Sequence, residues 1–293
     1  MIERVGIVGV GVMGTAMSGH LITAGYKVHG YDIDQARVES LVERGGIGEL
    51  SATDVARTSD LVLFSLPSVE ALDVASRHVA AGAHEGLIAA EMGTLPVPAK
   101  QAARDRLADV GVELMDVPVS GTGLQAADAT LVVMASGSES AFAATKPVFD
   151  AIGRATYYLG PFPSGSVMKF IANLLVSVHT LAAAEAHTLG LAAGMDPAVV
   201  QEVIADGVGR SAMFEIRGPM MVSDAYDPPS ARLDIIKKDA GIIQEFARSV
   251  GAATPLLDAA LPMYRAASEA GLGDLDAAAL CRYLERVGGK ART

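Results

Sequence analysis

The segment Gly9-Val10-Gly11-Val12-Met13-Gly14 constrains the fold of this chain more than any other feature. It follows a short apolar run at residues 4–8, and an uncharged stretch of helical length follows it as far as Tyr26. A second apolar run then ends at Tyr31. A strand, a tight glycine turn, a helix and a second strand in this order predict a β–α–β unit with parallel strands.

The three glycines of this segment each meet a separate physical need. Gly9 allows the tight turn, Gly11 lets the backbone approach a pyrophosphate, and Gly14 lets the helix pack closely on the strand. The free N–H groups and the positive dipole end of the helix attract phosphate. We therefore expect a dinucleotide cofactor whose phosphates are held by Gly9, Gly11, Val12, Met13 and Gly14. The alternative is a glycine-rich turn that binds no ligand.

Asp32 follows the second apolar run, 21 residues after Gly11. A carboxylate at this place accepts hydrogen bonds from the adenine-ribose hydroxyls and repels a 2′-phosphate, so it predicts NAD rather than NADP. Arg37 is a cation that would favour a 2′-phosphate, but Ile33 and not a base directly follows Asp32. NADP therefore remains an alternative cofactor.

Short apolar runs alternate with amphipathic stretches through the first half of the chain. The runs are continuous, as in Leu61-Val62-Leu63-Phe64, which is typical of parallel strands covered by helices on both faces. We predict strands at residues 4–8, 27–31, 61–65, 87–91, 112–116, 130–135 and 155–159, with helices at 13–24, 35–43, 69–80, 97–109 and 139–151. This order indicates an α/β domain of the Rossmann type, with a doubly wound and mostly parallel sheet.

The pattern changes at the segment Gly160-Pro161-Phe162-Pro163-Ser164-Gly165, where prolines and glycines mark a boundary. After it, periodic apolar residues predict helices at about 166–190, 197–205, 233–250, 255–270 and 276–286. We therefore expect two domains. Residues 1–163 form the cofactor-binding domain, and residues 164–293 form an all-α domain that begins with a long interdomain helix.

Charge and cysteine content exclude several classes of protein. The chain has 23 Lys and Arg against 34 Asp and Glu, a net charge of −11 that disfavours a nucleic-acid binder. Its single cysteine, Cys281, excludes an internal disulfide framework, and its six histidines lack metal-ligand spacing, so we expect no metal site. Glycines interrupt the uncharged stretch at residues 5–26, which therefore resembles neither a signal peptide nor a membrane span. We expect a cytoplasmic protein that does not bind a membrane.

Lys169 and Asn173 are four residues apart, so they share one face of the predicted helix. Apolar neighbours such as Phe170 and Ile171 predict that this helix is largely buried. A buried lysine needs a charged partner or a lowered pKa, and catalytic lysines arise in this way. The alternative is a lysine whose ammonium extends to solvent at a domain boundary.

The segment Ser120-Gly121-Thr122 comes shortly after the predicted strand at residues 112–116. Ligands of open α/β sheets bind beyond the carboxyl ends of the strands. A serine hydroxyl and the N–H groups of a glycine-containing loop hold a carboxylate without an arginine. The segment therefore predicts a carboxylate site, with a plain surface turn as the alternative.

Five motifs in order along nearly the whole chain resemble those of one enzyme family. They are the glycine hexapeptide followed by Met17 and Leu21, then Phe64-Ser65-Leu66-Pro67-Ser68, Glu91-Met92-Gly93-Thr94, the run from Asp116 to Gly123, and the run from Gly165 to Asn173. Together they resemble the β-hydroxyacid dehydrogenases, a family that includes 3-hydroxyisobutyrate dehydrogenases and tartronate semialdehyde reductases. The resemblance implies reversible hydride transfer between NAD and the β-hydroxyl carbon of a small hydroxycarboxylate, such as 3-hydroxyisobutyrate or 2-hydroxy-3-oxopropanoate.

The resemblance also implies roles for individual residues. Lys169 would exchange a proton with the reacting oxygen, and Asn173 would orient the substrate or this lysine. The carboxylate would lie on Ser120, Gly121 and Thr122. The remaining cofactor contacts implied by the resemblance are Leu66, Pro67 and Thr94. Lys238 of the Lys238-Asp239 pair would reach the site from the second domain and contact substrate and cofactor, unless it belongs to a solvated helix face.

The family is usually dimeric or tetrameric, so the resemblance also implies a homo-oligomer. Several positions depart from its pattern: His20 replaces Asn, Gly93 replaces Ser, Thr122 replaces the second Gly of the substrate segment, Ala129 replaces Gly, and Leu174 replaces the second Asn of the catalytic segment. Thr122 puts 3-hydroxyisobutyrate itself in doubt as the substrate. An NADPH-dependent imine reductase, which usually lacks the lysine, and a non-catalytic NAD-binding protein are the alternatives. The chain is too short for a 6-phosphogluconate dehydrogenase.

Overall fold

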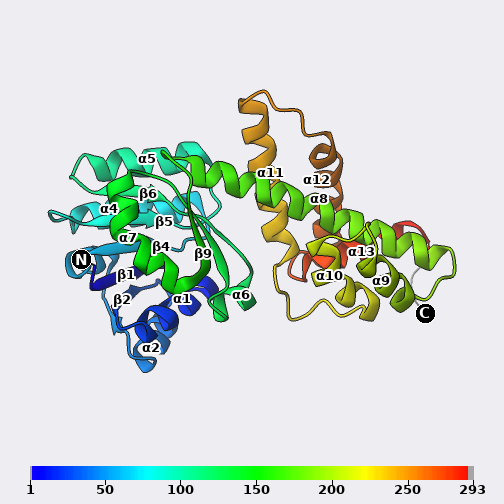
Figure 1. The fold of residues 1–293 in the computed structure, drawn as a ribbon, viewed down its shortest axis with the longest axis horizontal. Helices are drawn as coiled ribbons and strands as arrows, with labels where there is room; N and C mark the ends of the chain where they lie inside the picture. Colours follow the sequence, from blue (N-terminus) through cyan, green and yellow to red (C-terminus); the bar gives the residue numbers. More distant parts are fainter. Residues whose placement is uncertain (1, 290–293) are drawn as a thin grey trace. The chain divides into compact units, whose positions relative to one another are not determined.

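The computed structural model describes residues 2–289 (Figure 1). The chain divides into two compact units, of which the first ends at Lys169 and the second begins at Phe170. The long helix α8, Ser164–Ala192, begins in the first unit and continues into the second.

A six-stranded sheet forms the centre of the first unit, in the order β3-β2-β1-β4-β5-β6. Its strands are β1 Arg4–Val8, β2 Lys27–Tyr31, β3 Ile47–Gly48, β4 Leu61–Phe64, β5 Ile88–Glu91 and β6 Glu113–Asp116. All five pairings between neighbours are parallel. The chain order reverses between β1 and β4, and the carboxyl ends of strands at such a point form a binding crevice. The predicted Rossmann-type architecture is confirmed.

Helices cover both faces of this sheet. They are α1 Val12–Thr23, α2 Gln35–Glu43, α3 Ala52–Thr58, α4 Val69–Ala81, α5 Val97–Ala108 and α7 Glu139–Ile152. The side chains of β4 show the two-sided burial: Leu61 and Leu63 belong to one apolar cluster, and Val62 and Phe64 belong to another. Alternate residues of a strand point to opposite faces, so a strand that is apolar throughout must be covered on both sides.

Two of the predicted strands form a second, smaller sheet instead of extending the first. β8 Leu131–Ala135 pairs antiparallel with β7 Val119–Ser120 and parallel with β9 Gly153–Tyr158. The short helix α6 Gly123–Ala127 lies between β7 and β8 in the chain. Neither β7 nor α6 was predicted, because two and five residues are too few to show a period.

The second unit is helical within the described residues. After α8 follow α9 Pro197–Asp206, α10 Ala212–Ser223, α11 Leu233–Ser249, α12 Pro255–Ala267, a π-helical turn at Ser268–Leu272, a 3₁₀ turn at Ala277–Ala279, and α13 Leu280–Val287. The sequence prediction missed α10, which contains Gly218 and Pro219, two residues that ordinarily disfavour a helix interior. The all-α C-terminal region is confirmed.

Buried polar groups tie the helices of the second unit together. The Arg217 guanidinium lies 3.1 Å from Asp276 Oδ1, and both side chains are almost fully buried. Asp276 also accepts hydrogen bonds from the backbone N–H groups of Ser230, Ala231 and Ala278. The hydroxyl of Tyr264 donates to the carbonyl of Ser177 on α8 at 2.9 Å. These contacts are structural and have no counterpart among the predicted site residues.

Helix α8 is long and apolar enough to cross a membrane by length and composition alone, since it has 29 residues. Close to half of its most apolar window is buried in the protein, as in the core helix of a globular domain. The prediction that this helix is largely buried is wrong for its outer face, because the side chains of Met168, Ile171 and Leu175 are 39%, 54% and 48% exposed.

Candidate active site

The glycine turn between β1 and α1 has a geometry that only glycine permits at two positions. Gly9 has a φ of +97°, and a Cβ there would collide with the carbonyl oxygen of Ser65. A Cβ on Gly14 would collide with the carbonyl of Gly9. At Gly11, by contrast, the nearest atom to an added Cβ is a nitrogen of Arg37 at 3.4 Å. The backbone of Gly11 is therefore open to a ligand that approaches closely.

The first turn of α1 faces this opening. Its N-cap is Gly11, which has no side chain to accept a hydrogen bond from the first-turn N–H groups. The neighbouring Val12 is 74% exposed, and both residues line an open groove of about 780 Å³ together with Arg37 and Arg44. Free N–H groups, a positive helix end and nearby guanidinium groups suit an anion, so the turn fits the pyrophosphate of a dinucleotide.

Asp32 is 8% exposed at the carboxyl end of β2 and is already hydrogen-bonded within the protein. Its Oδ2 accepts the N–H of Val10 at 2.8 Å, and its Oδ1 accepts the N–H of Asp34 at 2.9 Å. A guanidinium nitrogen of Arg37 lies 3.6 Å from Oδ2. Asp32 thus fixes the glycine turn to the neighbouring strand, a role that its sequence position alone does not reveal. Each carboxylate oxygen retains a second lone pair for a ribose hydroxyl.

Leu66, Pro67 and Thr94 lie on the loops that follow β4 and β5, at the carboxyl edge of the sheet. The structure explains why Gly93 stands where the family motif has Ser. Glu91 turns back so that its Oε1 accepts the N–H of Gly93 at 2.7 Å, and a Cβ on Gly93 would lie 2.8 Å from that same oxygen. A side chain at residue 93 would therefore crowd this oxygen, and glycine avoids that contact.

The predicted carboxylate site lies at the end of β7. Gly121 has a φ of +144°, and a Cβ there would lie 2.6 Å from a methyl carbon of Leu131. Thr122 is the N-cap of α6: its hydroxyl accepts the N–H of Leu124 at 3.3 Å and donates to Gln125 Oε1 at 2.5 Å. The threonine that replaces glycine at this position therefore caps α6, and its hydroxyl is already hydrogen-bonded to Gln125.

His20 is a third departure from the family pattern that the structure explains. Its ring Nε2 lies 2.9 Å from the carbonyl of Ala126 at the far end of α6. His20 and the Thr122 cap therefore hold the two ends of α6, the helix that directly follows the predicted carboxylate site. The structure supplies no comparable contact for Leu174.

Lys169 and Asn173 lie on α8 and are 9% and 7% exposed. They are four residues apart and so share a face of the helix. Asn173 donates its Nδ2–H to Asp239 Oδ2 at 2.8 Å, and Lys238 Nζ lies 3.1 Å from Asp239 Oδ1. Within the second unit the structure thus brings two predicted site residues, Asn173 and Lys238, to one carboxylate. The sequence prediction assigned no role to Asp239, although it adjoins Lys238.

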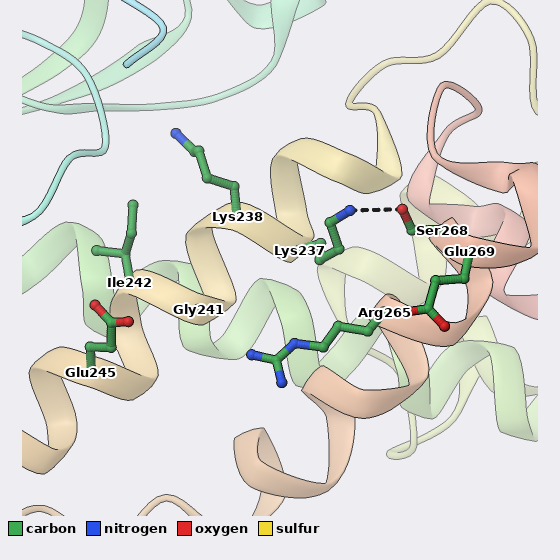
Figure 2. Close-up of a pocket in the computed structure, with 8 residues that line it drawn as sticks. All are labelled: Lys237, Lys238, Gly241, Ile242, Glu245, Arg265, Ser268 and Glu269. Carbon is green, nitrogen blue, oxygen red and sulfur yellow. Dashed lines mark hydrogen bonds between the residues drawn. The ribbon is translucent and has the colours of Figure 1, made fainter. Parts of the chain in front are cut away.

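Lys238 borders an open pocket of about 370 Å³ in the second unit (Figure 2). The lining residues are Lys237, Lys238, Gly241, Ile242, Glu245, Arg265, Ser268 and Glu269. Lys237 donates to Ser268 Oγ at 2.7 Å and pairs with Asp234 at 2.7 Å, so it holds the π-helical turn against α11. Of the two neighbouring lysines, Lys237 has the structural contacts predicted for a charged helix face. Lys238 extends its ammonium in another direction (Figure 2).

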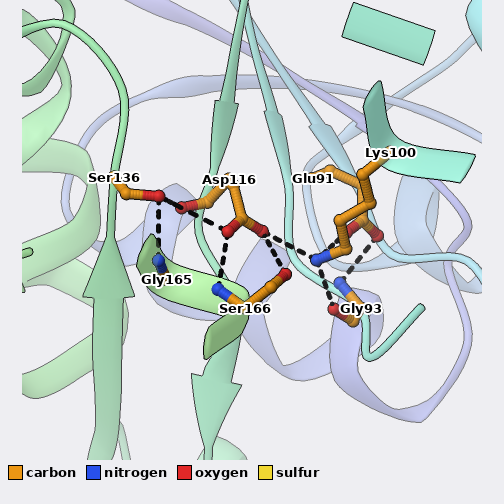
Figure 3. Close-up of polar contacts among 7 residues, drawn as sticks. All are labelled: Glu91, Gly93, Lys100, Asp116, Ser136, Gly165 and Ser166. Carbon is orange, nitrogen blue, oxygen red and sulfur yellow. Dashed lines mark hydrogen bonds and ion pairs between the residues drawn. The ribbon is translucent and has the colours of Figure 1, made fainter. Parts of the chain in front are cut away.

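A buried charged cluster, absent from the sequence prediction, lies at the ends of β5 and β6 (Figure 3). Lys100 of α5 is fully buried and pairs with Glu91 at 2.5 Å and with Asp116 at 2.8 Å. Burial alone would lower the pKa of the Lys100 ammonium, but the two carboxylates outweigh burial and raise its pKa above the ordinary value. The sequence did contain a signal, because Lys100, Ala103 and Leu107 form the buried stripe of α5.

Comparison with known proteins assigns the family. Residues 4–160 match the NAD binding domain of 6-phosphogluconate dehydrogenase, and residues 163–284 match the NAD-binding domain of NADP-dependent 3-hydroxyisobutyrate dehydrogenase. This chain belongs to the 3-hydroxyisobutyrate dehydrogenase family. The predicted resemblance, the oxidoreductase class and the NAD(P) cofactor are confirmed.

Individual members of the family are similar along nearly their full length. An L-threonate dehydrogenase of Cupriavidus necator is 34% identical over 98% of both chains. An NAD-dependent L-serine dehydrogenase of Pseudomonas aeruginosa is 31% identical over 94% of this chain and 95% of its own. The crystal structure of a 3-hydroxyisobutyrate dehydrogenase from Salmonella typhimurium is 33% identical, with a TM-score of 0.87 over 96% of this chain and 99% of its own.

Imine reductases share the fold at lower similarity. The enzyme from Myxococcus stipitatus is 19% identical with a TM-score of 0.65, over 97% of this chain and 100% of its own. Similarity at that level concerns the architecture alone. The chain is an NAD(P)-dependent hydroxyacid dehydrogenase by family, and the residues that act on substrate must be argued from its own chemistry.

Proposed function

We propose that this protein reversibly oxidises the β-hydroxyl of a small hydroxycarboxylate with NAD. The observation that carries the proposal is the Lys169–Asn173 pair, two polar side chains almost buried on one face of an apolar helix and in register with the catalytic motif of the family. Nearly buried lysines are rare unless they are paired or functional. A non-catalytic NAD-binding protein would have no need for this pair.

The proposed substrate site begins at the loop after β7. The hydroxyl of Ser120 and the backbone N–H groups around Gly121 would hold the substrate carboxylate, because such a loop offers several donors to one anion. Thr122 would shape this loop through its cap rather than donate its hydroxyl, which Gln125 already accepts. Lys238 would supply positive charge to the anionic substrate and cofactor, in a protein whose net charge is −11.

Lys169 is the proposed acid–base group. Its amine would take the proton from the substrate hydroxyl during oxidation and return it during reduction. Asn173 would orient the substrate or the lysine, with its own amide fixed by the hydrogen bond to Asp239 at 2.8 Å. Bound NAD supplies the hydride chemistry, and the protein supplies placement and charge. The glycine turn, Leu66, Pro67 and Thr94 are the proposed contacts to that cofactor.

The proposed cofactor preference is for NAD. Asp32 places a carboxylate at the end of β2, where a 2′-phosphate would meet a negative charge. Arg37 pairs with this carboxylate at 3.6 Å and is half exposed. If NADP binds, the guanidinium of Arg37 is the group that would contact the 2′-phosphate.

The proposed substrates are small carboxylates with a nearby hydroxyl. The relatives named L-threonate dehydrogenase and NAD-dependent L-serine dehydrogenase support this class, as does the 3-hydroxyisobutyrate dehydrogenase structure. Thr122 would affect the choice among them, because the family pattern has glycine at this position.

We further propose a cytoplasmic homodimer or homotetramer. Exposed apolar side chains on α8, Met168, Ile171, Leu175 and Leu189, support association, and Val203 of α9 adds to them. Clusters of exposed apolar side chains are typical of protein interfaces.

The experiment is a substrate panel of 3-hydroxyisobutyrate, L-serine, L-threonate and glycerate, each with NAD and with NADP, followed by the absorbance of the reduced nicotinamide. Lys169→Ala should lower kcat by about 10²–10⁴-fold, the usual size of acid–base help, while NAD binding persists. Lys146→Ala, on the exposed side of α7, is the matched control and should leave kcat unchanged. Near-normal turnover of the Lys169→Ala variant would contradict the assignment. Cofactor binding without turnover on any substrate would favour a non-catalytic protein.

A further inference from the structure

The ammonium of Lys100 has every donor engaged. It pairs with Glu91 Oε2 at 2.5 Å and Asp116 Oδ1 at 2.8 Å, and it donates to the carbonyl of Gly93 at 2.9 Å (Figure 3). Three donors and three acceptors leave no capacity for a ligand. Lys100 is therefore not a substrate or cofactor contact, and its effect must pass through the residues that it holds.

On one side, Lys100 holds the turn that carries a proposed cofactor contact. Glu91 ends β5 and accepts the N–H of Gly93, while Lys100 takes the carbonyl of the same residue. Both polar backbone groups of Gly93 are thus fixed by the cluster. Thr94 is the next residue along the chain, so its backbone is set by this turn.

On the other side, Asp116 caps the first turn of α8. Its Oδ2 accepts the N–H of Ser166 at 2.6 Å, and its Oδ1 accepts the Ser166 hydroxyl at 2.8 Å. Ser136 Oγ accepts the N–H of Gly165 at 2.9 Å and donates to the carbonyl of Asp116 at 3.0 Å. The first N–H groups of a helix have no partner within the helix, and a carboxylate is favoured at that end. A strand residue therefore caps a helix that begins about fifty positions later in the chain.

This cap leaves α8 little freedom at its start. A Cβ on Gly165 would lie 2.5 Å from the carbonyl oxygen of Met134 and 2.6 Å from that of Asp116. The helix backbone is thus in direct contact with the strand ends. Lys169 follows Ser166 by three residues, so both side chains lie on the same face, one turn apart. The contacts of Ser166 with Asp116 therefore fix the position and direction of the helix turn that carries Lys169.

We propose that Lys100 and Asp116 are positioning residues for the hydride-transfer reaction, which together hold the Thr94 turn and the first turn of α8 in one fixed arrangement. The proposal rests on the proposed function of Lys169. A buried cluster of one ammonium and two carboxylates contributes little net stability, because desolvation offsets the attraction, and apolar groups of the same volume would pack as well. What apolar groups lack is the directional set of hydrogen bonds that joins the two elements. A shift of about 1 Å in a catalytic group costs a rate factor on the order of 10².

The test compares Asp116→Asn with Ser166→Ala and with a control. Asp116→Asn keeps the shape but loses one acceptor, so the Ser166 contacts and the Lys100 pair cannot all be kept. Ser166→Ala removes one hydroxyl and leaves the backbone cap, so it serves as the mild variant that folds. The control is Arg217→Met, which breaks a buried ion pair of the second unit that contains no proposed site residue.

We expect Asp116→Asn to lower kcat by about 10–100-fold and Ser166→Ala by about 3–10-fold, with KM for the hydroxyacid nearly unchanged and a larger isotope effect for deuterated substrate. Arg217→Met should lose thermal stability yet keep kcat below its melting temperature. Losses of kcat that follow the loss of stability equally in all three variants would overturn the proposal, as would an unchanged kcat in Ser166→Ala and Asp116→Asn. Because the proposed function is tested by Lys169→Ala, an inactive Lys169→Ala beside a fully active Asp116→Asn would reject the positioning role alone.

Discussion

Asn173 of α8 donates its side-chain N–H to Asp239 of α11 at 2.8 Å, and both side chains are buried. This bond fixes which end of the Asn173 amide is the donor toward Asp239, and so directs the amide oxygen away from it. Asp239 also pairs with Lys238 at 3.1 Å. One carboxylate thus orients two of the residues that the sequence motifs identify.

Asp239→Leu is expected to lower kcat by about tenfold or more, because Asn173 loses the acceptor that holds its amide and Lys238 loses its counter-charge. Steady-state kinetics with the best substrate of the panel would measure this. The matched control is Asp234→Leu, five residues earlier on α11, where the carboxylate pairs with Lys237 and is about half exposed. Equal kcat in the two variants would show that Asp239 has no orienting role.

Gly93→Ser is expected to destabilise the protein by about 1–3 kcal/mol, since an added Cβ would lie 2.8 Å from Glu91 Oε1 in a packed interior. Glu91→Asp shortens the offending side chain and restores the acidic residue of the family motif. The double variant should therefore be more stable than the sum of the two single changes predicts. Urea denaturation of all four proteins measures this coupling, and strictly additive free energies of unfolding would contradict it.

The sequence was sufficient for those features that depend on local pattern. Every predicted strand and helix of the first half exists within two residues of its predicted ends, and the glycine turn at Gly9 has the backbone it requires. Long apolar runs and periodic helices can be recognised from neighbouring residues alone, because the face on which a side chain lies depends on its position along the helix or strand. The short elements β3 and β7 could not be found in this way, since two residues have no period.

The partners of buried charged residues cannot be identified from a single sequence. Lys100 meets Asp116 across 16 positions, and Asp116 meets Ser166 across 50, through contacts that exist only once three elements have packed. The sequence shows that Lys100 is charged and that it falls on the apolar face of its predicted helix, so a buried lysine could be suspected there. It does not give the partner that makes its burial tolerable.

Arg37→Gln is expected to reduce the use of NADP while leaving that of NAD nearly unchanged, because the Asp32 carboxylate keeps its backbone donors and loses only the cation at 3.6 Å. The reverse change, Asp32→Ser, removes the negative charge and should raise the NADP to NAD ratio of kcat/KM by about tenfold, equal to about 1.4 kcal/mol. It should also weaken the glycine turn, since the N–H of Val10 loses its charged acceptor. The kcat/KM ratio for the two cofactors measures both variants, and an unchanged ratio in each would contradict these roles.

Asp60 gives the acid dependence of stability a definite sign. Burial favours its protonated form, but hydrogen bonds from the Arg4 side chain and from the N–H groups of Glu3 and Arg4 outweigh burial and lower the pKa of Asp60 from 3.8 to about 2. A carboxyl whose pKa is lower in the folded state stabilises the protein above its unfolded pKa, and this stability is lost as the pH falls from about 4 to about 2.

Asp60→Asn should therefore unfold at lower urea concentration than the wild type at pH 7, and this difference in midpoint should close as the pH falls through that range. Asp274→Asn, at a side chain that is 94% exposed, is the control and should show no gap at either pH. A difference between Asp60→Asn and the wild type that stays constant over the acidic range would mean that the charge of Asp60 does not stabilise the start of β1.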